Sequence, residues 1–343
     1  LLDRVVKRCL AKDPDERWQS AGDLGAELQW ITEGATEARR PESPRRRRWS
    51  GERLIWLGVS ATLLAGLASN LSRIPGSQAL DRPVVRATLP LAMDETIARA
   101  EDLPLGVGRP SLAISPDGSK VAFVVREDRG TRIHLRGLAD AESTPLQNTE
   151  DGFDPFFSPD GQWLAFFTAD KLKKVSLSGG EAVTLCDAPT PFGGSWGDDD
   201  RIVFSAEEGG ELARVSAMDG HTEILRSDFS GWPRWPQVLP GGRAVLLSAL
   251  EGPIASGNPD YWSLIAFFPE TGETKVVLRG GSFARYLPTG HVIYVRGGAV
   301  HAVPFDPERV EITGSPTPVL DGVQVEGEGA AQLSYSQDGT LVY

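Results

Sequence analysis

A short hairpin turn recurs along most of the chain and limits the folds that the chain can adopt. Its clearest copy is the run Ser-Pro-Asp-Gly at residues 158–161, with two phenylalanines before it and the apolar stretch Trp163–Phe167 after it. Proline presets φ for the second turn position, and aspartate hydrogen-bonds back to nearby amides. Glycine takes the left-handed conformation that closes such a turn. The stretch therefore predicts a β-hairpin.

Equivalent turns, some of them degenerate, occur six times. They are counted from Ser115, Ser158, Ser195, Leu239, Leu287 and Ser336. The steps between them are 43, 37, 44, 48 and 49 residues, and each turn precedes a short apolar strand. A period in the forties that carries several short strands is typical of β-propeller blades. We therefore expect a mainly β fold, a propeller of about six blades in which five repeats are complete and the sixth stops after two strands.

Eight turn residues are the best-defined positions within these repeats. They are Pro116, Asp117, Gly118, Pro159, Asp160, Gly161, Asp338 and Gly339. Their aspartates are calcium ligands in type, but the turns lie some forty residues apart, so we expect local hydrogen bonding instead. The four histidines and two cysteines show no ligand spacing. We therefore expect no metal and no cofactor in this chain.

Two motifs inside the repeats resemble functional sites. Gly193–Gly197 matches the hydrolase pattern G-x-S-x-G, but a nucleophile elbow needs a helix after the turn, and here a strand is expected. We therefore interpret this motif as a blade turn. The aromatic run Trp232-Pro233-Arg234-Trp235-Pro236 has two interpretations. Trp232, Arg234 and Trp235 line a binding face, or the tryptophans wedge between blades.

The amino-terminal residues follow a different pattern. Apolar residues recur at helical spacing in residues 1–10 and again from Leu24 to Ile31, so two helices are expected within residues 1–38. The run Arg-Cys-Leu-Ala-Lys-Asp-Pro-Asp-Glu-Arg-Trp-Gln-Ser-Ala at 8–21 resembles the last helices of bacterial, eukaryotic-like serine/threonine protein kinases. The resemblance implies that Arg17 makes a structural ion pair within the kinase fold. It also implies a parent protein that binds Mg-ATP and phosphorylates protein hydroxyls.

The chain itself lacks the machinery of phosphate transfer. It contains no kinase Gly-rich loop, no strand lysine paired to a glutamate, no catalytic-loop aspartate and no metal-binding aspartate motif. We therefore expect no catalytic residue here and no kinase activity from this chain alone.

A linker and a membrane span are expected between the helices and the repeats. Arg39–Arg53 contains seven arginines and predicts a solvated linker. Leu54–Ser72 contains nineteen residues without a charge, enough to cross a bilayer as a helix. Because the arginines precede the span, the positive-inside rule places the amino end in the cytoplasm and the repeats outside the inner membrane. Gly58, Thr62 and Gly66 recur every fourth residue and would let two spans pack as a homodimer.

The charge of the chain is unevenly distributed. Residues 1–53 carry 12 Lys or Arg against 10 Asp or Glu, whereas the remainder carries 23 against 37. The acidic body would not neutralise phosphates, so we expect no nucleic-acid partner.

The repeats resemble TolB-type, WD-like β-propellers over residues 108–343. We therefore interpret the chain as a fragment of a single-pass receptor-type kinase. Its parts are a kinase end (1–38), a linker (39–53), a transmembrane helix (54–72) and a propeller incomplete at its carboxyl end (84–343). The propeller would act as an extracytoplasmic sensor or protein-docking module in signal transduction. Two alternatives stay open, a non-catalytic membrane-anchored binding scaffold and a propeller that gates a downstream peptidase.

The ring of blades also needs a closing strand. Val84–Leu89 is apolar enough to form one, and we expect it to lie against the final blade as an amino-terminal clasp.

Replacing Leu63 by arginine should abolish most of the membrane insertion. An arginine near the bilayer centre costs about 2.5–3.5 kcal/mol, against about 2–5 kcal/mol favouring insertion from the eight Leu, Ile and Val residues of the span. Protease added to spheroplasts should digest the wild-type repeats and spare the basic linker. Protected repeats with a cleaved amino end would show the opposite orientation.

Overall fold

The computed structural model describes residues 84–92, 95–103, 109–205, 211–228, 231–251, 259–326 and 329–343. The helices expected in residues 1–38, the arginine-rich linker and the span expected at 54–72 lie outside the described residues. Residues 87–343 form one structural unit. None of the described helices is both long and apolar enough to cross a membrane.

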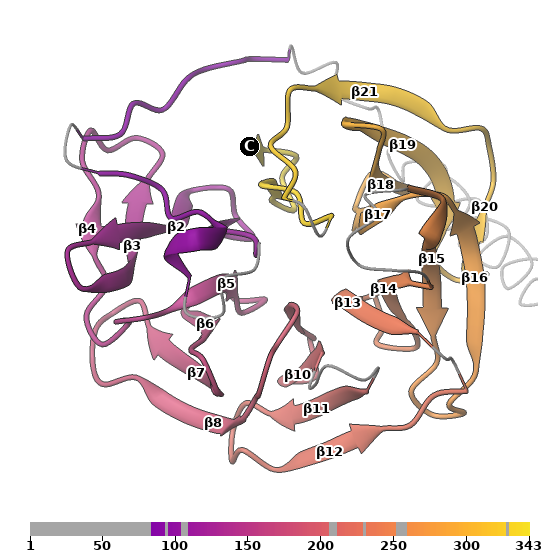
Figure 1. The fold of residues 1–343 in the computed structure, drawn as a ribbon, viewed down its shortest axis with the longest axis horizontal. Coiled ribbons are helices and arrows are strands. Elements are labelled where there is room, and N and C mark those ends of the chain that lie inside the picture. The colour runs from indigo at the N-terminus through magenta and orange to yellow at the C-terminus, as the bar shows by residue number, and fades with distance from the viewer. Residues whose placement is uncertain are drawn as a thin grey trace, which may run out of the picture. The chain divides into compact units, whose positions relative to one another are not determined.

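Five antiparallel sheets follow one another along this unit and form its blades (Figure 1). Blade 1 contains β1 (Leu112–Ile114), β2 (Lys120–Glu127), β3 (Gly130–Gly137) and β4 (Thr144–Pro145). Blade 2 contains β5 (Phe153–Phe157), β6 (Trp163–Phe167), β7 (Lys171–Ser176) and β8 (Val183–Asp187). Blade 3 contains β9 (Gly194–Trp196), β10 (Arg201–Ser205), β11 (Leu212–Ser216) and β12 (Thr222–Leu225).

The last two blades continue the pattern. Blade 4 contains β13 (Trp232–Val238), β14 (Val245–Leu250), β15 (Trp262–Phe267) and β16 (Thr274–Arg279). Blade 5 contains β17 (Ser282–Leu287), β18 (His291–Arg296), β19 (Ala299–Asp306) and β20 (Glu311–Ile312). In blade 5 a further strand, β21 (Thr317–Asp321), also pairs with β19. A two-stranded sheet of β22 (Ser334–Tyr335) and β23 (Leu341–Val342) follows.

The fold is thus a mainly β propeller with five complete blades. The expected count was about six blades. The structure has five complete blades, and the two strands β22 and β23 stand where the sixth was expected. The described helices are two short 3₁₀ turns, η2 (Ala100–Asp102) and η4 (Pro259–Tyr261).

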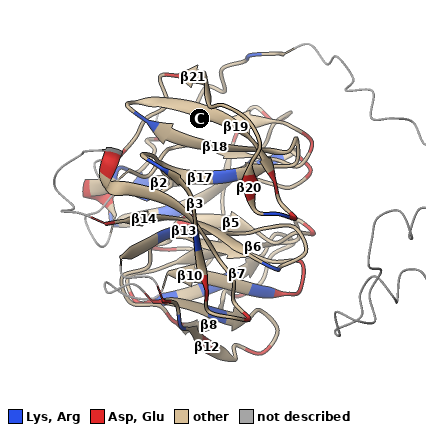
Figure 2. Ribbon diagram, turned by 90° about the vertical axis from the view of Figure 1, so that its right-hand side faces the viewer, with Lys and Arg blue, Asp and Glu red and all other residues tan. Residues whose placement is uncertain are grey.

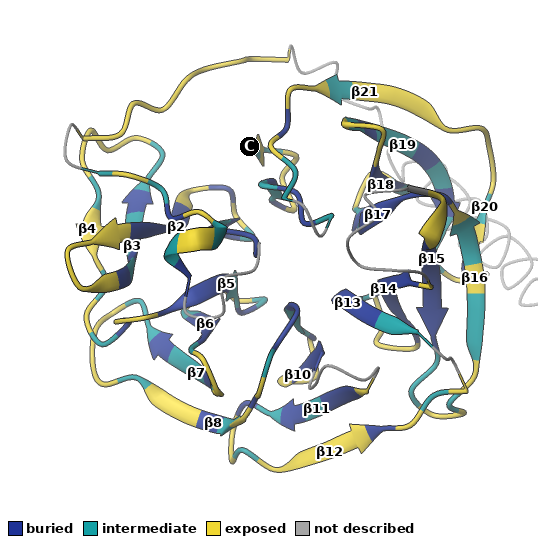
Figure 3. Cartoon of the chain, in the orientation of Figure 1, coloured by how far each residue is buried: buried dark blue, intermediate teal, exposed yellow. Residues whose placement is uncertain are grey.

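Each blade is most buried in its middle strands (Figure 3). Every residue of β14 and of β15 is buried, whereas three of the four residues of β12 are exposed. The middle strands lie between neighbouring blades, so both of their faces need apolar side chains. This explains why runs such as Val-Leu-Leu-Ser-Ala-Leu in β14 do not alternate between apolar and polar residues.

The two-stranded sheet joins the last blade to the first. The Gln332 side chain accepts a hydrogen bond from the Ser111 amide at 2.7 Å and donates one to the Arg109 carbonyl at 2.8 Å. Its amide group therefore pairs with the chain before β1 much as a neighbouring strand would. On the other side, the Tyr335 hydroxyl donates to the Tyr286 carbonyl of β17 at 2.6 Å. The inner ring is thus continuous from β17 through β22 to β1.

The predicted amino-terminal clasp is wrong. Residues 84–89 form no strand, and the side chains of Val84 and Val85 are 85% and 82% exposed. The outer edge of the last blade is occupied instead by β20 and β21, which both pair with β19. Apolar composition alone suggested a strand here, but the edge that it would cover already has a partner.

Replacing Gln332 by alanine should lower the melting temperature. The variant loses the two hydrogen bonds between Gln332, two residues before β22, and the segment before β1, each worth about 0.5–1.5 kcal/mol, and a longer one to Glu326 at 3.3 Å. For a domain of this size, a loss of about 1–3 kcal/mol lowers the midpoint by roughly 2–12 °C. Gln162→Ala is the matched control, because Gln162 is exposed and its side chain makes no hydrogen bond to a described residue. Equal midpoints for the two variants would show that the ring does not depend on this pairing.

Candidate functional site

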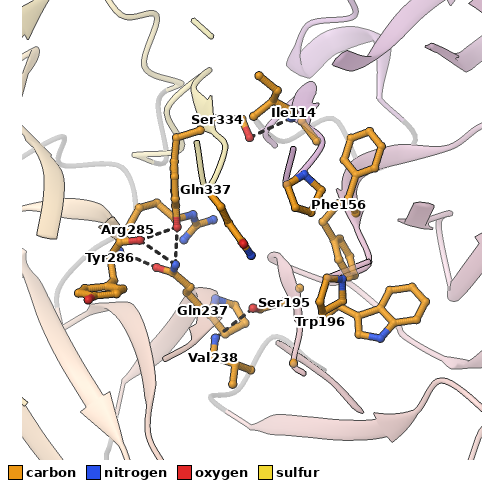
Figure 4. Close-up of a pocket in the computed structure, with 18 of the residues that line it drawn as sticks. Ile114, Phe156, Ser195, Trp196, Gln237, Val238, Arg285, Tyr286, Ser334 and Gln337 are labelled. Atoms are coloured by element: carbon orange, nitrogen blue, oxygen red, sulfur yellow. Dashed lines mark hydrogen bonds between the residues drawn. The ribbon is translucent and has the colours of Figure 1, made fainter. Parts of the chain in front are cut away.

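The inner strands of the blades surround a cavity of about 590 Å³ in the centre of the ring. β1, β5, β9, β13, β17 and β22 all contribute to its wall. Figure 4 shows side chains from these strands facing the same space. The size is typical of a pocket for a small ligand or for a short peptide segment.

A repeated β-bulge shapes the strands around this cavity. Asp154, Trp235 and Phe283 each stand four positions before a turn anchor (Ser158, Leu239 and Leu287) and have φ values of 50°, 48° and 53°. Register shifts in β5, β13 and β17 surround the same positions. A bulge of this kind re-aims the side chains that follow it. The residues two positions further on, Phe156, Gln237 and Arg285, line the cavity.

Polar side chains on the cavity wall bond neighbouring blades together. The Ser195 hydroxyl accepts a hydrogen bond from the Val238 amide at 3.0 Å. The Gln237 side chain accepts one from the Tyr286 amide at 2.6 Å. In the structure the third turn begins at Gly197, whose amide donates to the Arg201 carbonyl, two residues later than the sequence spacing placed it. In both cases the acceptor therefore lies two positions before one turn, and the donor lies one position before the next turn.

The same bond closes the ring. Ser334 accepts a hydrogen bond from the Ile114 amide at 3.1 Å, so the last inner strand is tied to the first in the same way. We call these three contacts the inner-strand bonds. They occupy the polar groups of Ser195, Gln237 and Ser334 in holding the ring.

Arg285 occupies the same repeat position without making an inner-strand bond. Its Nη1 donates to the Trp235 carbonyl at 2.7 Å and to the Ala284 carbonyl at 2.9 Å. The guanidinium also lies over the Phe283 ring, 4.3 Å from its centroid. Nε and Nη2 make no hydrogen bond to any residue that the structure describes. One guanidinium edge is therefore anchored, and the other is available on the wall of the cavity.

Asp154 is a buried carboxylate in the same wall. The residue is 5% exposed, and its side chain accepts a hydrogen bond from the Gly193 amide. Its Oδ2 atom has no hydrogen-bond partner among the described residues. Burial raises the pKa of Asp154 to about 7, against the opposing effect of Arg109, Arg285 and the Gly193 bond. Arg285 forms no ion pair with it in the described part of the chain.

Two more arginines are buried behind the wall, and Figure 2 shows basic residues along strands as well as in connections. Arg109 and Arg234 are each 1% exposed. Their guanidinium carbons lie 3.9 Å and 3.7 Å from the centroid of the Phe192 ring. Arg109 also donates to the Pro191 carbonyl at 2.6 Å. Stacking on an aromatic ring stabilises a guanidinium that has little access to water.

The predicted turn residues lie where the hairpins were expected. Asp160 accepts hydrogen bonds from the Ser158 hydroxyl at 2.5 Å and from the Gln162 amide at 3.0 Å, and Gly161 has a φ of 67°. The bond from Ser158 lowers the pKa of Asp160. Pro159 precedes them and reaches the cavity wall.

The other two turns of this type have the same geometry. Asp117 accepts from the Ser115 hydroxyl at 2.5 Å, which lowers its pKa to about 2. Asp338 accepts from the Ser336 hydroxyl and from the Thr340 amide. Gly118 and Gly339 have φ values of 70° and 97°. Pro116 lines the cavity and its carbonyl accepts the amide of Gln337, so two of these turns meet at the mouth.

Of the two interpretations of the Trp232–Pro236 run, the binding face does not hold for two of its three residues. Arg234 is 1% exposed and Trp235 is 0% exposed, because both belong to the inner strand β13. Trp235 stacks on Trp262 with ring centroids 5.4 Å apart. Trp232 is half-buried beside the same cluster. Aromatic density here reflects packing between strands. Arg17, predicted to make a kinase-fold ion pair, lies outside the described residues.

The hydrolase-like motif is a blade turn. Ser195 lies in β9, and the strand β10 follows the turn at once. The Ser195 hydroxyl accepts the Val238 amide, so the serine holds two blades together.

Asp154 and Arg285 were missed by sequence reasoning. Once the third turn is placed at Gly197, alignment of the six turns puts Arg285 at a repeat position that otherwise holds Ala113, Phe156, Ser195, Gln237 and Ser334. A lone arginine at that position is the signal that was available. Nothing local marks Asp154, because its burial results from the neighbouring blades.

Comparison with known proteins supports the fold. No family model matches the chain, and no curated protein does. A solved structure of a putative TolB from Agrobacterium tumefaciens aligns with a TM-score of 0.53 at 16% identity, over 68% of this chain and 87% of that one. TolB from Acinetobacter baumannii aligns with a TM-score of 0.45 at 18% identity, over 64% and 57%. An oligogalacturonate lyase in complex with manganese aligns with a TM-score of 0.48 at 16% identity, over 76% and 85%. The chain has a TolB-like β-propeller fold.

Asp154→Asn should make the free energy of unfolding less dependent on pH. The folded-state pKa of about 7 exceeds the unfolded value of about 3.9. Between these values the folded state binds more protons, so the stability of the wild type falls as pH rises from about 4 to about 7. Asparagine still accepts the Gly193 amide but cannot ionise. In urea titrations the variant should therefore gain more stability over the wild type at pH 8 than at pH 5.

Asp160→Asn is the control of opposite sign. The lowered pKa of Asp160 means that its carboxylate stabilises the fold above the unfolded pKa and loses this effect as pH falls. This variant should be less stable than the wild type at pH 8. If Asp154→Asn also lost stability at pH 8, the description of Asp154 as a buried, destabilised carboxylate would be contradicted.

Proposed function

We propose that residues 87–343 are the ligand-binding module of a membrane-bound, receptor-type serine/threonine protein kinase. The central cavity would receive the ligand or partner segment, and the propeller would act as an extracytoplasmic sensor or docking module. The observation that carries this proposal is the cavity wall itself. It presents an anchored guanidinium with a free edge at Arg285, in a space of about 590 Å³.

The kinase and membrane parts rest on sequence alone. They are supported by the kinase-like run at 8–21 and by the uncharged stretch Leu54–Ser72 behind seven arginines. The parent protein would bind Mg-ATP in the cytoplasm, and its span would place the propeller outside the bacterial inner membrane. The span would also let two copies associate.

A non-catalytic scaffold and a peptidase gate remain the alternatives. A scaffold would use the same cavity without any phosphate transfer by the whole protein. A gate would need a peptidase domain in the same polypeptide. Phosphorylation measurements on the whole protein therefore separate the kinase from the scaffold.

Blocking the cavity mouth should change phosphorylation by the whole protein in sealed inverted vesicles. Gln337 is exposed and lines the mouth, and a cysteine there, with Cys9 and Cys186 replaced by serine, would accept a bulky maleimide. The maleimide is applied while the repeats still face the medium. Inverted vesicles are then prepared, and Mg-ATP is added to them. We expect the rate of phosphate transfer to change by about five-fold or more, the lower end of usual allosteric couplings.

The matched control is Met218→Cys, also in an exposed turn and 80% exposed. Its labelling should leave the rate unchanged. Equal rates for the two labelled proteins would overturn the sensor role. Absence of phosphate transfer by the unlabelled protein would overturn the kinase assignment and favour the scaffold.

A further inference from the structure

We propose that the central cavity binds a carboxylate group, held by the free edge of the Arg285 guanidinium, on a ligand whose neighbouring groups are apolar. The inference deepens the proposed function, since it names the chemistry of the ligand that the cavity would receive. It also stands apart from the kinase assignment, because it needs only the propeller.

The first argument is the geometry of the guanidinium. Nη1 is held by the carbonyls of Trp235 and Ala284 at 2.7 Å and 2.9 Å. The edge that remains consists of Nε–H and one Nη2–H, which point the same way from a planar group. Two parallel donors of this kind match the two oxygens of a carboxylate. Because the side chain is already anchored and stacked on Phe283, little rotamer entropy remains to be lost on binding.

The second argument is the charge around that edge. Arg109 lies close enough to act on Asp154 electrostatically, as Arg285 does. Of the carboxylates on the described cavity wall, Asp154 is buried and Asp198 is exposed at the turn after β9. The Tyr335 hydroxyl, whose pKa burial raises to about 12, stays protonated and neutral. Near neutral pH the interior of the cavity is therefore positive or neutral, and an anion is attracted to it.

The third argument is the remainder of the wall. Phe156 and Trp196 line the cavity from β5 and β9, and Pro116, Pro159 and Pro288 come from the turns at its mouth. These side chains offer apolar contact beside polar groups that also line the cavity, among them Asp198 and Gln337. The polar side chains nearby, Gln237 and Ser334, already make inner-strand bonds. A carboxylate with an aromatic or aliphatic neighbour would use both the Arg285 edge and these apolar contacts.

A carboxylate of this kind has two sources. It is either a free organic acid, or the end or an acidic side chain of a peptide. Both would use the same Arg285 edge, so the shared chemistry is what the structure supports.

Arg285 also has a purely structural interpretation, as a tie between β17 and β13. That role uses only Nη1, which bonds the Trp235 carbonyl. A lysine would keep the positive charge and one donor for that carbonyl, but it has no second parallel donor. Arg285→Lys therefore separates the structural role from carboxylate binding.

The test is binding of 3-phenylpropionate and its neutral amide to the full chain in detergent micelles, followed by saturation-transfer NMR and calorimetry. We expect the acid to bind with a Kd in roughly the millimolar range, as suits a ligand of its size. The amide should bind at least about ten-fold more weakly, because it offers one acceptor oxygen and no charge. A peptide ending in phenylalanine, with a free or an amidated carboxyl end, forms the second arm. Binding of the free peptide alone would assign the site to peptides.

Three variants accompany the ligands. Arg285→Met and Arg285→Lys should both lose at least about ten-fold in affinity for the acid. Arg243→Met, an exposed arginine that bonds the Glu308 carbonyl at 3.2 Å, should bind like the wild type. Asp154→Asn should bind the acid more tightly than the wild type at pH 8, and the difference should shrink at pH 6, where Asp154 itself is protonated.

Equal affinities for acid and amide, or an unchanged affinity in Arg285→Lys with a wild-type melting curve, would overturn the proposal. The outcomes are distinguishable from those for the proposed function. Carboxylate binding without any effect of the cavity block on phosphorylation would refute the sensor role alone. An effect of the block without carboxylate binding would refute the ligand class alone.

Discussion

The hydrogen bond that a cavity-facing side chain accepts from the inner-strand amide of the next blade is the contact on which the rest of the structure depends. Ser195, Gln237 and Ser334 make it between three different pairs of blades. Without it, the amides of Val238, Tyr286 and Ile114 would face the cavity unpaired, and an unpaired buried amide costs about 1–3 kcal/mol. The β-bulge before Gln237 sets the direction of its side chain. Bulge and bond together keep the centre of the ring open and its wall fixed.

Arg285 is the exception to this pattern. It stands at the same repeat position as Ser195, Gln237 and Ser334, but it makes no inner-strand bond. Its guanidinium is held by hydrogen bonds from Nη1 only. The carboxylate of Asp154 lies nearby without an ion pair to it in the described residues. A structure that needed only stability would pair these two charges or replace them with apolar side chains. The retained, separated charges in a pre-formed cavity favour a role in binding.

Local sequence predicted local structure well. The turn at 158–161 and the strand Trp163–Phe167 follow from the proline and glycine of the turn and from the apolar residues after it, and the structure has them at those residues.

Prediction failed where burial depends on distant segments. Trp235 and Arg234 looked like a surface patch because their covering partners, among them Phe192 and Trp262, lie tens of residues away. Val84–Leu89 looked like a strand because its composition allows one, whereas the edge of blade 5 was already paired. Asp154 and Arg285 interact across more than a hundred residues, so no local pattern contains them.

The most direct test of this account is amide hydrogen exchange at Ile114, Val238 and Tyr286. If the inner-strand bonds keep the ring of blades closed around an open cavity, these three amides should exchange slowly although they face a solvent-accessible space. Their rates should match those of the ladder amides in the buried strand β14. Replacing Ser334 by alanine should then speed exchange at Ile114 and leave Val238 protected. Rapid exchange at all three amides in the unaltered protein would show that the inner ring opens readily, and would contradict a pre-formed binding cavity.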